Sequence, residues 1–167
     1  MTFVNEAYAV LKLLKAQQVH LVLAESCTGG LVAARLAEVP GASQWFCGSA
    51  VTYREQTKEA WLGVSSDALA RWSGVSEPVS VELAVGVLEK TPEASLAASV
   101  TGHLGPDAPV DLDGVIFLAT TWRGKSDCVT VRHQLTERER LPRQQEAAGL
   151  VLQQLVKVLS EGELRVC

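Results

Sequence analysis

Short apolar runs of strand length alternate with amphipathic helical segments along this chain of 167 residues. Apolar residues at helical spacing predict helices, and short apolar runs bounded by turn residues predict strands. The predicted helices cover residues 3–18, 28–39, 56–62, 66–72 and 77–90, and a long C-terminal helix has the apolar face Ala147, Ala148, Val151, Leu155, Val158 and Leu159. The predicted strands cover residues 20–24, 45–53, 95–101, 115–122 and 126–134.

This order of elements restricts the chain to an α/β fold. Helices that separate strands have to cover both faces of a sheet. The last two strands are joined through Arg123-Gly124-Lys125, which is typical of a β-hairpin, so part of the sheet is antiparallel. We therefore predict a three-layer α/β/α sandwich with a mixed, mostly parallel sheet of about five strands. The length fits a single domain over residues 1–167.

Composition and charge exclude several classes of function. The formal net charge is −4, and no run of lysine and arginine is long enough to form a nucleic-acid face. The arginines between residues 132 and 143 alternate with Glu137 and Glu139, which is typical of a solvated helix start. No secretory signal opens the chain, and no apolar run approaches the ~18 residues of a membrane span. We expect a soluble cytoplasmic protein whose partner is a small molecule.

Two patterns mimic known sites but lack their context. The stretch ATTWRGKS, residues 119–126, ends like a phosphate-binding P-loop, but Ala119 stands where the first glycine belongs and a strand-like segment follows where a helix is required. The four cysteines show no CxxC or zinc-type spacing, which favours buried or idle thiols and predicts no metal; they are Cys27, Cys47, Cys128 and Cys167.

The stretch AESCTGG, residues 24–30, joins a predicted strand to a predicted helix. A side chain at this junction lies at the carboxyl edge of the sheet, where open α/β sheets bind ligands. Gly29 and Gly30 leave room for close approach, and the amides at the start of the helix favour a phosphate or an oxyanion. Ser26 is therefore a candidate nucleophile. The alternative is that Ser26 or Thr28 only caps the helix.

A serine nucleophile needs a base, and the sequence offers several. The GxSxG elbow is absent. His20 and His133 lie at unsuitable strand positions, whereas His103 follows a strand end in a loop and is within reach of the site. Lys58 follows the second strand, and burial lowers the pKa of a lysine toward neutrality. Either Lys58 or a loop histidine fits this role, and a solvent-facing Lys58 is the alternative.

Four stretches together resemble motifs of the CinA C-terminal domain family, the bacterial nicotinamide-nucleotide amidohydrolases. They are AESCTGGLVAARLAEVPGAS, VTYREQTKEAWLGV, VSEPVSVELAVGVLE and VTGHLGP, in the family's order. The similarity extends from about Phe3 to Leu159. It implies a three-layer α/β/α fold and the hydrolysis of the carboxamide of nicotinamide mononucleotide (NMN) without a metal or other cofactor. A family member of this size is often a dimer, and Trp45, Trp61 and Trp72 are candidates for an interface or for the core.

The resemblance also implies roles for individual residues. Ser26 corresponds to the proposed nucleophile, Lys58 to its base and Tyr53 to a further residue of the catalytic set. Backbone amides at the start of the helix would stabilise the oxyanion, and Arg35, Arg138 or Arg143 would meet the phosphate. The predicted substrate-binding residues are Cys27, Thr28, Gly29, Gly30, Thr101, Gly102, His103, Arg138 and Arg143.

Two departures from the family pattern leave alternatives open. In the loop that usually reads TGIAGPGGG, His103 replaces an apolar residue, and Asp107, Asp111 and Asp113 follow in a region that is usually rich in glycine. The segment F-x-GDR-x-x-[IV]-R is altered to LTERERLPR. A nucleotide-binding or regulatory module without turnover, an amidase for another pyridine amide, and a metal-dependent hydrolase that uses the three aspartates are the alternatives.

Overall fold

The computed structural model describes residues 4–162 and is built around one five-stranded sheet with the strand order β2-β1-β3-β4-β5. The strands are β1 (Leu21–Glu25), β2 (Phe46–Val51), β3 (Leu96–Gly102), β4 (Val115–Trp122) and β5 (Cys128–Gln134). The two pairs that include β1 are parallel, and the β3-β4 and β4-β5 pairs are antiparallel. The predicted mixed sheet is thus confirmed, with its parallel half at β2-β1-β3.

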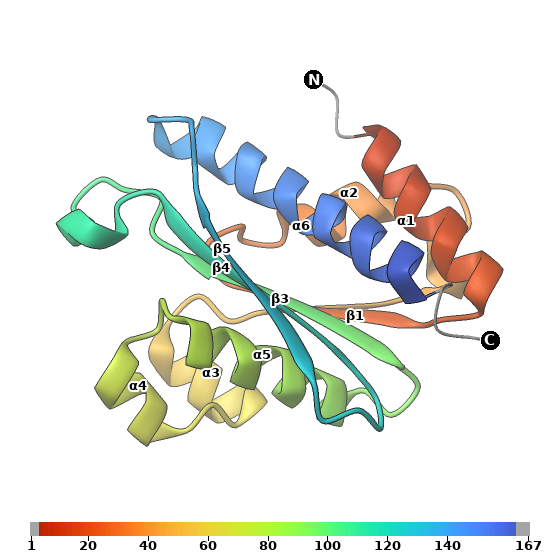
Figure 1. Ribbon diagram of the computed structural model, residues 1–167, viewed down its shortest axis with the longest axis horizontal. Coiled ribbons are helices and arrows are strands. Elements are labelled where there is room, and N and C mark those ends of the chain that lie inside the picture. The colour runs from red at the N-terminus through yellow and green to blue at the C-terminus, as the bar shows by residue number, and fades with distance from the viewer. Residues whose placement is uncertain (1–3, 163–167) are drawn as a thin grey trace.

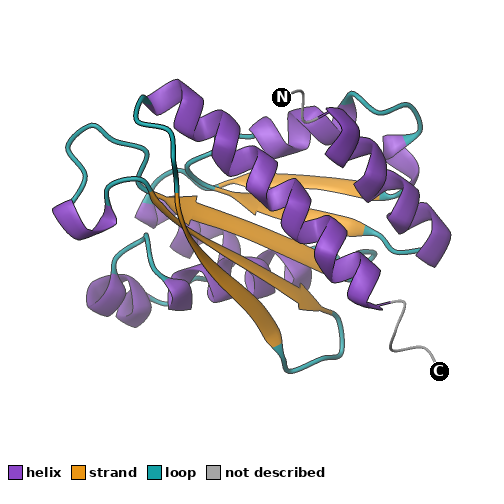
Figure 2. Ribbon diagram, turned by 45° about the horizontal axis from the view of Figure 1, so that its top comes forward, coloured by secondary structure: helices purple, strands orange, loops and turns teal. Residues whose placement is uncertain are grey.

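Helices cover both faces of this sheet, as predicted (Figures 1 and 2). On one face lie α1 (Val4–Gln17), α2 (Leu31–Ala37) and α6 (Arg140–Gly162). On the other lie α3 (Glu55–Leu62), α4 (Ser66–Trp72) and α5 (Glu77–Lys90). Short 3₁₀ helices at Ala42–Gln44 and Val110–Leu112 complete the chain. The chain therefore forms the expected α/β/α sandwich.

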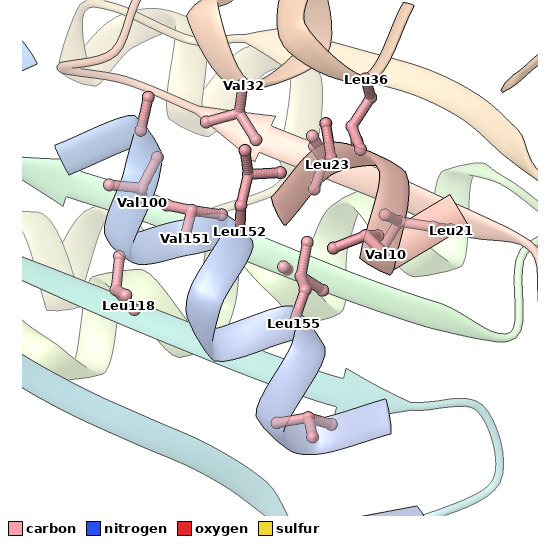
Figure 3. Close-up of a cluster of buried hydrophobic side chains, with 14 of the residues drawn as sticks. Val10, Leu21, Leu23, Val32, Leu36, Val100, Leu118, Val151, Leu152 and Leu155 are labelled. Atoms are coloured by element: carbon pink, nitrogen blue, oxygen red, sulfur yellow. The ribbon is translucent and has the colours of Figure 1, made fainter. Parts of the chain in front are cut away.

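The alternation of side chains along β1 explains the two cores. Leu21 and Leu23 point into a cluster with α1, α2 and α6, whereas Val22 and Ala24 point into a second cluster with α3, α4 and α5. Successive residues of a strand face opposite sides of the sheet, so a strand buried on both faces is apolar throughout. Figure 3 shows the first cluster, in which Leu152 and Leu155 of α6 meet Val10 of α1 and Leu21 and Leu23 of β1.

The element boundaries agree with the predicted ones to within two residues, except at the start of α2. The sequence predicts this helix from residue 28, but it begins at Leu31, because residues 26–30 form a turn in which Gly29 and Gly30 have positive φ angles of 62° and 96°. The Gly124-Lys125-Ser126 stretch lies between β4 and β5, so the P-loop interpretation is excluded. Phe3 and Cys167 lie outside the described residues.

The tryptophans that the sequence offers for an interface differ in exposure. Trp45 is partly buried against the first core cluster, and its ring lies 5.4 Å from that of His20. Trp61 and Trp72 are each more than half exposed. A membrane-crossing helix, with the required length and apolar character, is not found among residues 4–162.

Candidate active site

A cleft of about 420 Å³ opens where the parallel strands β1 and β3 end. Ligands of open α/β sheets bind at this edge. The loop after β2, the loop between α4 and α5, the loop after β3 and the first turn of α6 complete the walls. The lining residues that carry functional groups are Ser26, Cys27, Tyr53, Glu55, Lys58, Ser73, Thr101, His103 and Arg140.

Ser26 and Lys58 meet in this cleft. Ser26 follows the last residue of β1, and its amide donates to the carbonyl oxygen of Val100 at 3.0 Å. Lys58 comes from α3, and its Nζ lies 2.8 Å from Ser26 Oγ and donates to the carbonyl oxygen of Thr52 at 2.7 Å. Both side chains are buried, with exposed fractions of 7% for Ser26 and 2% for Lys58. The solvent-facing alternative for Lys58 is therefore wrong.

The environment of Lys58 favours its neutral form. Burial lowers the pKa of the Lys58 amine, while the nearby Cys27 thiol and the Glu55 carboxylate oppose this shift. Desolvation penalises the charged ammonium and has no comparable effect on the neutral amine. A neutral amine next to a hydroxyl can accept its proton, so the pair can generate an oxygen nucleophile.

Several of the amides at the start of α2, which the sequence predicts as an anion site, are already bound within the protein. Glu25, the last residue of β1, turns its carboxylate toward this helix and accepts hydrogen bonds from the amides of Gly30, Val32 and Ala33. The Thr28 hydroxyl also donates to Glu25, at 2.7 Å. The N-cap of α2 is Gly30, without a side-chain cap, so neither Ser26 nor Thr28 has the capping role of the alternative reading.

Within the turn, two amides stay available. The amide of Gly29 donates to Ser26 and that of Gly30 to Glu25, whereas the amides of Cys27 and Thr28 donate to no other residue among those that the structure describes. The amide of Cys27, a residue that lines the cleft, and the adjacent amide of Thr28 are therefore candidate donors to an oxyanion. Of the four turn residues predicted to bind the substrate, Cys27 lines the cleft, whereas Thr28, Gly29 and Gly30 do not.

The Cys27 thiol is a poor competitor of the Ser26 hydroxyl. It is 5% exposed, and burial raises its pKa to about 12. Because the thiolate is the reactive form of cysteine, a raised pKa suppresses its nucleophilicity.

The cation at the cleft is Arg140, which the sequence analysis did not select. Arg140 opens α6, and its guanidinium donates to the Tyr53 hydroxyl at 2.6 Å and to the carbonyl oxygen of Gly105. The Tyr53 side chain, whose hydroxyl accepts this hydrogen bond, is about half exposed. Together they present a guanidinium and a phenol at the cleft, a pair that can bind an anionic group.

The arginines that the sequence favours lie elsewhere. Arg143 is 7% exposed and forms a bidentate pair with Asp113 at 2.7 and 3.0 Å. It also donates to the carbonyl oxygens of Leu104 and Glu137, so it fastens the loop after β3 to α6. Arg138 is exposed and does not line the cleft. Arg35 donates to Gln145 of α6 and is not part of the cleft lining either.

The loop after β3 supplies the opposite wall. Thr101 is fully buried and donates to the carbonyl oxygen of Gly74 at 2.6 Å, which holds the α4-α5 loop against β3. Gly102 has to be a glycine, because an added Cβ would lie 2.4 Å from Ile116 Cγ2. Burial lowers the pKa of the His103 imidazole, against an opposing effect of the Asp113 carboxylate.

The three aspartates of this loop do not gather into a metal site. Asp107 and Asp111 are exposed, and Asp113 is paired with Arg143, whose hydrogen bond holds the pKa of the Asp113 carboxyl below its ordinary value. Within residues 4–162, no group of three His, Cys, Asp or Glu side chains is placed to hold a metal ion. In the described part of the chain, Asp113 is thus bound to Arg143 and is not grouped with the other two aspartates.

Some residues of the cleft carry no sequence signal. Glu55, at the start of α3, lines the cleft, and its Oε1 accepts from the amide of Gly74 in the α4-α5 loop at 2.7 Å. Ser73, Gly74 and Val75 enter the cleft from the α4-α5 loop. Loops of this kind have no periodicity, so their place in space follows only from the packing of the helices that they connect.

The fold and the cleft define a class of protein: an α/β/α sandwich that presents a serine beside a buried lysine at the carboxyl edge of a mixed sheet. The chain belongs to the CinA C-terminal domain family, whose pattern matches residues 5–159.

Individual relatives agree with this assignment. The chain is 41% identical over 115 residues to nicotinamide-nucleotide amidohydrolase PncC of Escherichia coli, covering 67% of this chain and 69% of the relative. It is 43% identical over 124 residues to a CinA-like protein of Myxococcus xanthus, covering 72% of this chain but only 29% of that relative. A crystal structure of a CinA superfamily protein from Klebsiella pneumoniae matches with a TM-score of 0.90 at 27% identity, covering 96% of this chain and 99% of that one.

Proposed function

We propose that this protein hydrolyses the carboxamide of NMN to nicotinate mononucleotide and ammonia, with Ser26 as nucleophile and Lys58 as base. The observation that carries the proposal is the 2.8 Å contact between Lys58 Nζ and Ser26 Oγ inside a cleft. The relative named nicotinamide-nucleotide amidohydrolase supports the substrate class. The Ser26–Lys58 route is the finer part of the proposal and needs its own test.

In the first half of the reaction, the hydroxyl of Ser26 attacks the carboxamide carbon and its proton passes to the neutral Lys58 amine. One N–H of that amine stays on the Thr52 carbonyl, which directs the lone pair toward Ser26. The negative charge that develops on the carboxamide oxygen is stabilised by the amides of Cys27 and Thr28. Each such donor is worth about 10²–10³ in rate when it is preorganised.

The tetrahedral intermediate then collapses. The carbon–nitrogen bond breaks, and the amine leaves as ammonia with the proton that Lys58 had accepted. A nicotinoyl ester of Ser26 remains. In the second half, Lys58 takes a proton from water as the water oxygen attacks the ester carbon, and returns that proton to Ser26 as the carbon–oxygen bond breaks. The enzyme is restored and the nicotinate product is released.

The remaining cleft residues bind the rest of the nucleotide. Arg140 and the Tyr53 hydroxyl meet the 5′-phosphate through charge-assisted hydrogen bonds. The negative charge of the neighbouring loop does not oppose this contact strongly, because Asp113 is paired with Arg143 and the exposed Asp107 and Asp111 do not line the cleft. Thr101, Gly102 and His103 form the wall against which the pyridine ring lies.

The deciding experiment is ammonia release from NMN by the purified chain, with and without a chelator, compared with Ser26→Ala and Lys58→Met. Both variants are expected to lose activity by at least about 10³-fold, since they remove the nucleophile and its base. Lys90→Met, which changes an exposed lysine at the end of α5, is the matched control. Turnover by Ser26→Ala at the wild-type rate would eliminate the serine route.

The same assay separates the alternatives. Binding of NMN by the wild type without any turnover would support a nucleotide-binding or regulatory module, and turnover of another pyridine amide in place of NMN would change the substrate. Loss of activity with the chelator would support a metal-dependent reaction. The dimeric state and the cytoplasmic location expected from the sequence stay predictions.

A further inference from the structure

Glu25, the residue before the candidate nucleophile Ser26, carries a buried carboxylate that has no part in the proposed reaction. Its side chain is 1% exposed. Oε2 accepts from Thr28 Oγ1 at 2.7 Å and from the amides of Gly30 and Val32 at 3.1 Å each. Oε1 accepts from the amide of Ala33 and from Ser49 Oγ, both at 3.0 Å. Among the described residues, no lysine or arginine forms a salt bridge with it.

Such an arrangement is costly unless every lone pair is used. A buried carboxylate without a counter-ion loses its hydration, and only hydrogen bonds and the positive end of a helix compensate. Five donors supply that compensation here, from β2, from α2 and from the turn between β1 and α2. An ordinary N-cap residue would satisfy the same amides without burying a charge. The position of Glu25, one residue before Ser26, therefore calls for another explanation.

The contacts fix the turn that carries Ser26 at both of its ends. The backbone of Glu25 is held in the sheet between β2 and β3, where it pairs with Val51 and Val100. Its side chain reaches over the turn and holds Thr28, Gly30 and the start of α2. Residues 26–29 are thereby held at both ends by contacts within the protein.

We propose that Glu25 is a positioning residue, which holds the turn so that Ser26 Oγ faces Lys58 and the Cys27 and Thr28 amides face the carboxamide oxygen. Its carboxylate accepts from the amides of Gly30, Val32 and Ala33. Only the amides of Cys27 and Thr28 then remain to stabilise the negative charge that develops in the reaction. This inference rests on the proposed amidohydrolase function. It predicts that Glu25 affects the chemical step and leaves substrate affinity nearly unchanged.

The test is Glu25→Gln, which keeps the size of the side chain but replaces one acceptor oxygen by an NH₂ group that faces donors. The kcat for NMN is expected to fall by about 10- to 100-fold, the usual effect of misplacing reacting groups. The KM is expected to stay within about twofold, because Arg140 and Tyr53 are untouched. Ser49→Ala, which removes one hydrogen bond to the carboxylate, gives a milder variant with an expected fall in kcat of about two- to tenfold.

The control is Glu82→Gln. The Glu82 carboxylate accepts from the amide and hydroxyl of Ser65 at the start of α4, and it lies outside the cleft. It is expected to lower the melting temperature without changing kcat. If Glu25→Gln and Ser49→Ala also lower only the melting temperature, or raise KM in place of lowering kcat, the positioning role is wrong.

A crystal structure of the Glu25→Gln protein makes the test independent of the substrate. The Ser26 Oγ to Lys58 Nζ distance is expected to lengthen beyond hydrogen-bonding range. An unchanged distance would overturn the inference. If the wild type releases no ammonia from NMN, the proposed function fails, but this distance still decides whether Glu25 holds the turn.

Discussion

Arg140 offers the sharpest test of how the cleft recognises a nucleotide. Its guanidinium contacts Tyr53 and the Gly105 carbonyl at the cleft, whereas Arg138, two residues earlier, is exposed outside it. Replacing each arginine by glutamine removes the same charge from neighbouring positions of the chain. A difference between the two variants therefore reports the place of the charge and not the net charge of the protein.

The size of the effect follows from the hydrogen bonds that a phosphate would lose. A hydrogen bond to a charged group is worth about 1.5–3 kcal/mol, which corresponds to roughly 10- to 150-fold in kcat/KM. Arg140→Gln is expected to lose that factor with NMN, mostly through KM, since the phosphate lies far from the reacting carbon. Arg138→Gln is expected to stay within about twofold of the wild type, as exposed charges contribute little.

The assay compares NMN with nicotinamide riboside, which lacks the phosphate but keeps the pyridinium and the carboxamide. With the riboside, the wild type and Arg140→Gln are expected to release ammonia with nearly equal kcat/KM. Steady-state kinetics of the three proteins with the two substrates thus isolate the phosphate contact. An equal loss on both substrates would refute phosphate recognition by Arg140 and indicate a structural role for its contact with Gly105.

Three further expectations follow from the structure. The kcat/KM should rise with pH as the ammonium of Lys58 loses its proton, and since burial lowers the Lys58 pKa, the midpoint of the rise should lie below the ordinary value of 10.5. A profile without this rise between pH 5 and 10 would argue against the lysine base. With a Cys27 pKa of about 12, roughly one thiol in 10⁴–10⁵ is ionised at pH 7.5, so iodoacetamide should label Cys27 by mass spectrometry only after unfolding in urea. Gly86→Ala should lower the free energy of unfolding by about 1–3 kcal/mol in urea titrations, because the new Cβ would lie 2.0 Å from the Leu62 carbonyl oxygen. Val85→Ala, at the exposed neighbouring position, should lower the free energy of unfolding by less.

The fold could be predicted from the sequence because its elements are long and strongly periodic. The apolar face of α6 predicts a helix, the apolar run of residues 21–24 predicts a buried strand, and the loop Arg123-Gly124-Lys125 indicates the antiparallel hairpin. The start of α2 was misplaced by three residues. Local sequence favours a helix from Thr28, but the carboxylate of Glu25 binds Thr28 and Gly30 and keeps the turn out of the helix.

The meeting of Ser26 and Lys58 could be predicted from the sequence, because it follows from the topology of the parallel strands. Ser26 and Lys58 each follow a parallel strand, and the ends of such strands meet at one edge of the sheet. The arginine was not predictable in the same way. Arg138, Arg140 and Arg143 lie within six residues, and only the point at which α6 begins determines which of them faces the cleft and which turns toward Asp113.

The proposed reaction has two negatively charged groups to stabilise, the oxyanion and the phosphate. The sequence predicts one element for both, whereas the structure favours a different element for each. The start of α2 was expected to hold an anionic ligand, but the protein's own carboxylate at Glu25 already occupies it. The phosphate of the proposed substrate is therefore expected at Arg140, on a different element from the candidate nucleophile. Because the turn around Ser26 is held from within, its geometry does not depend on whether the substrate carries a phosphate. A substrate without the phosphate should consequently bind weakly and yet react, once bound, at nearly the rate of NMN, whereas a turn ordered by the ligand would lose kcat as well.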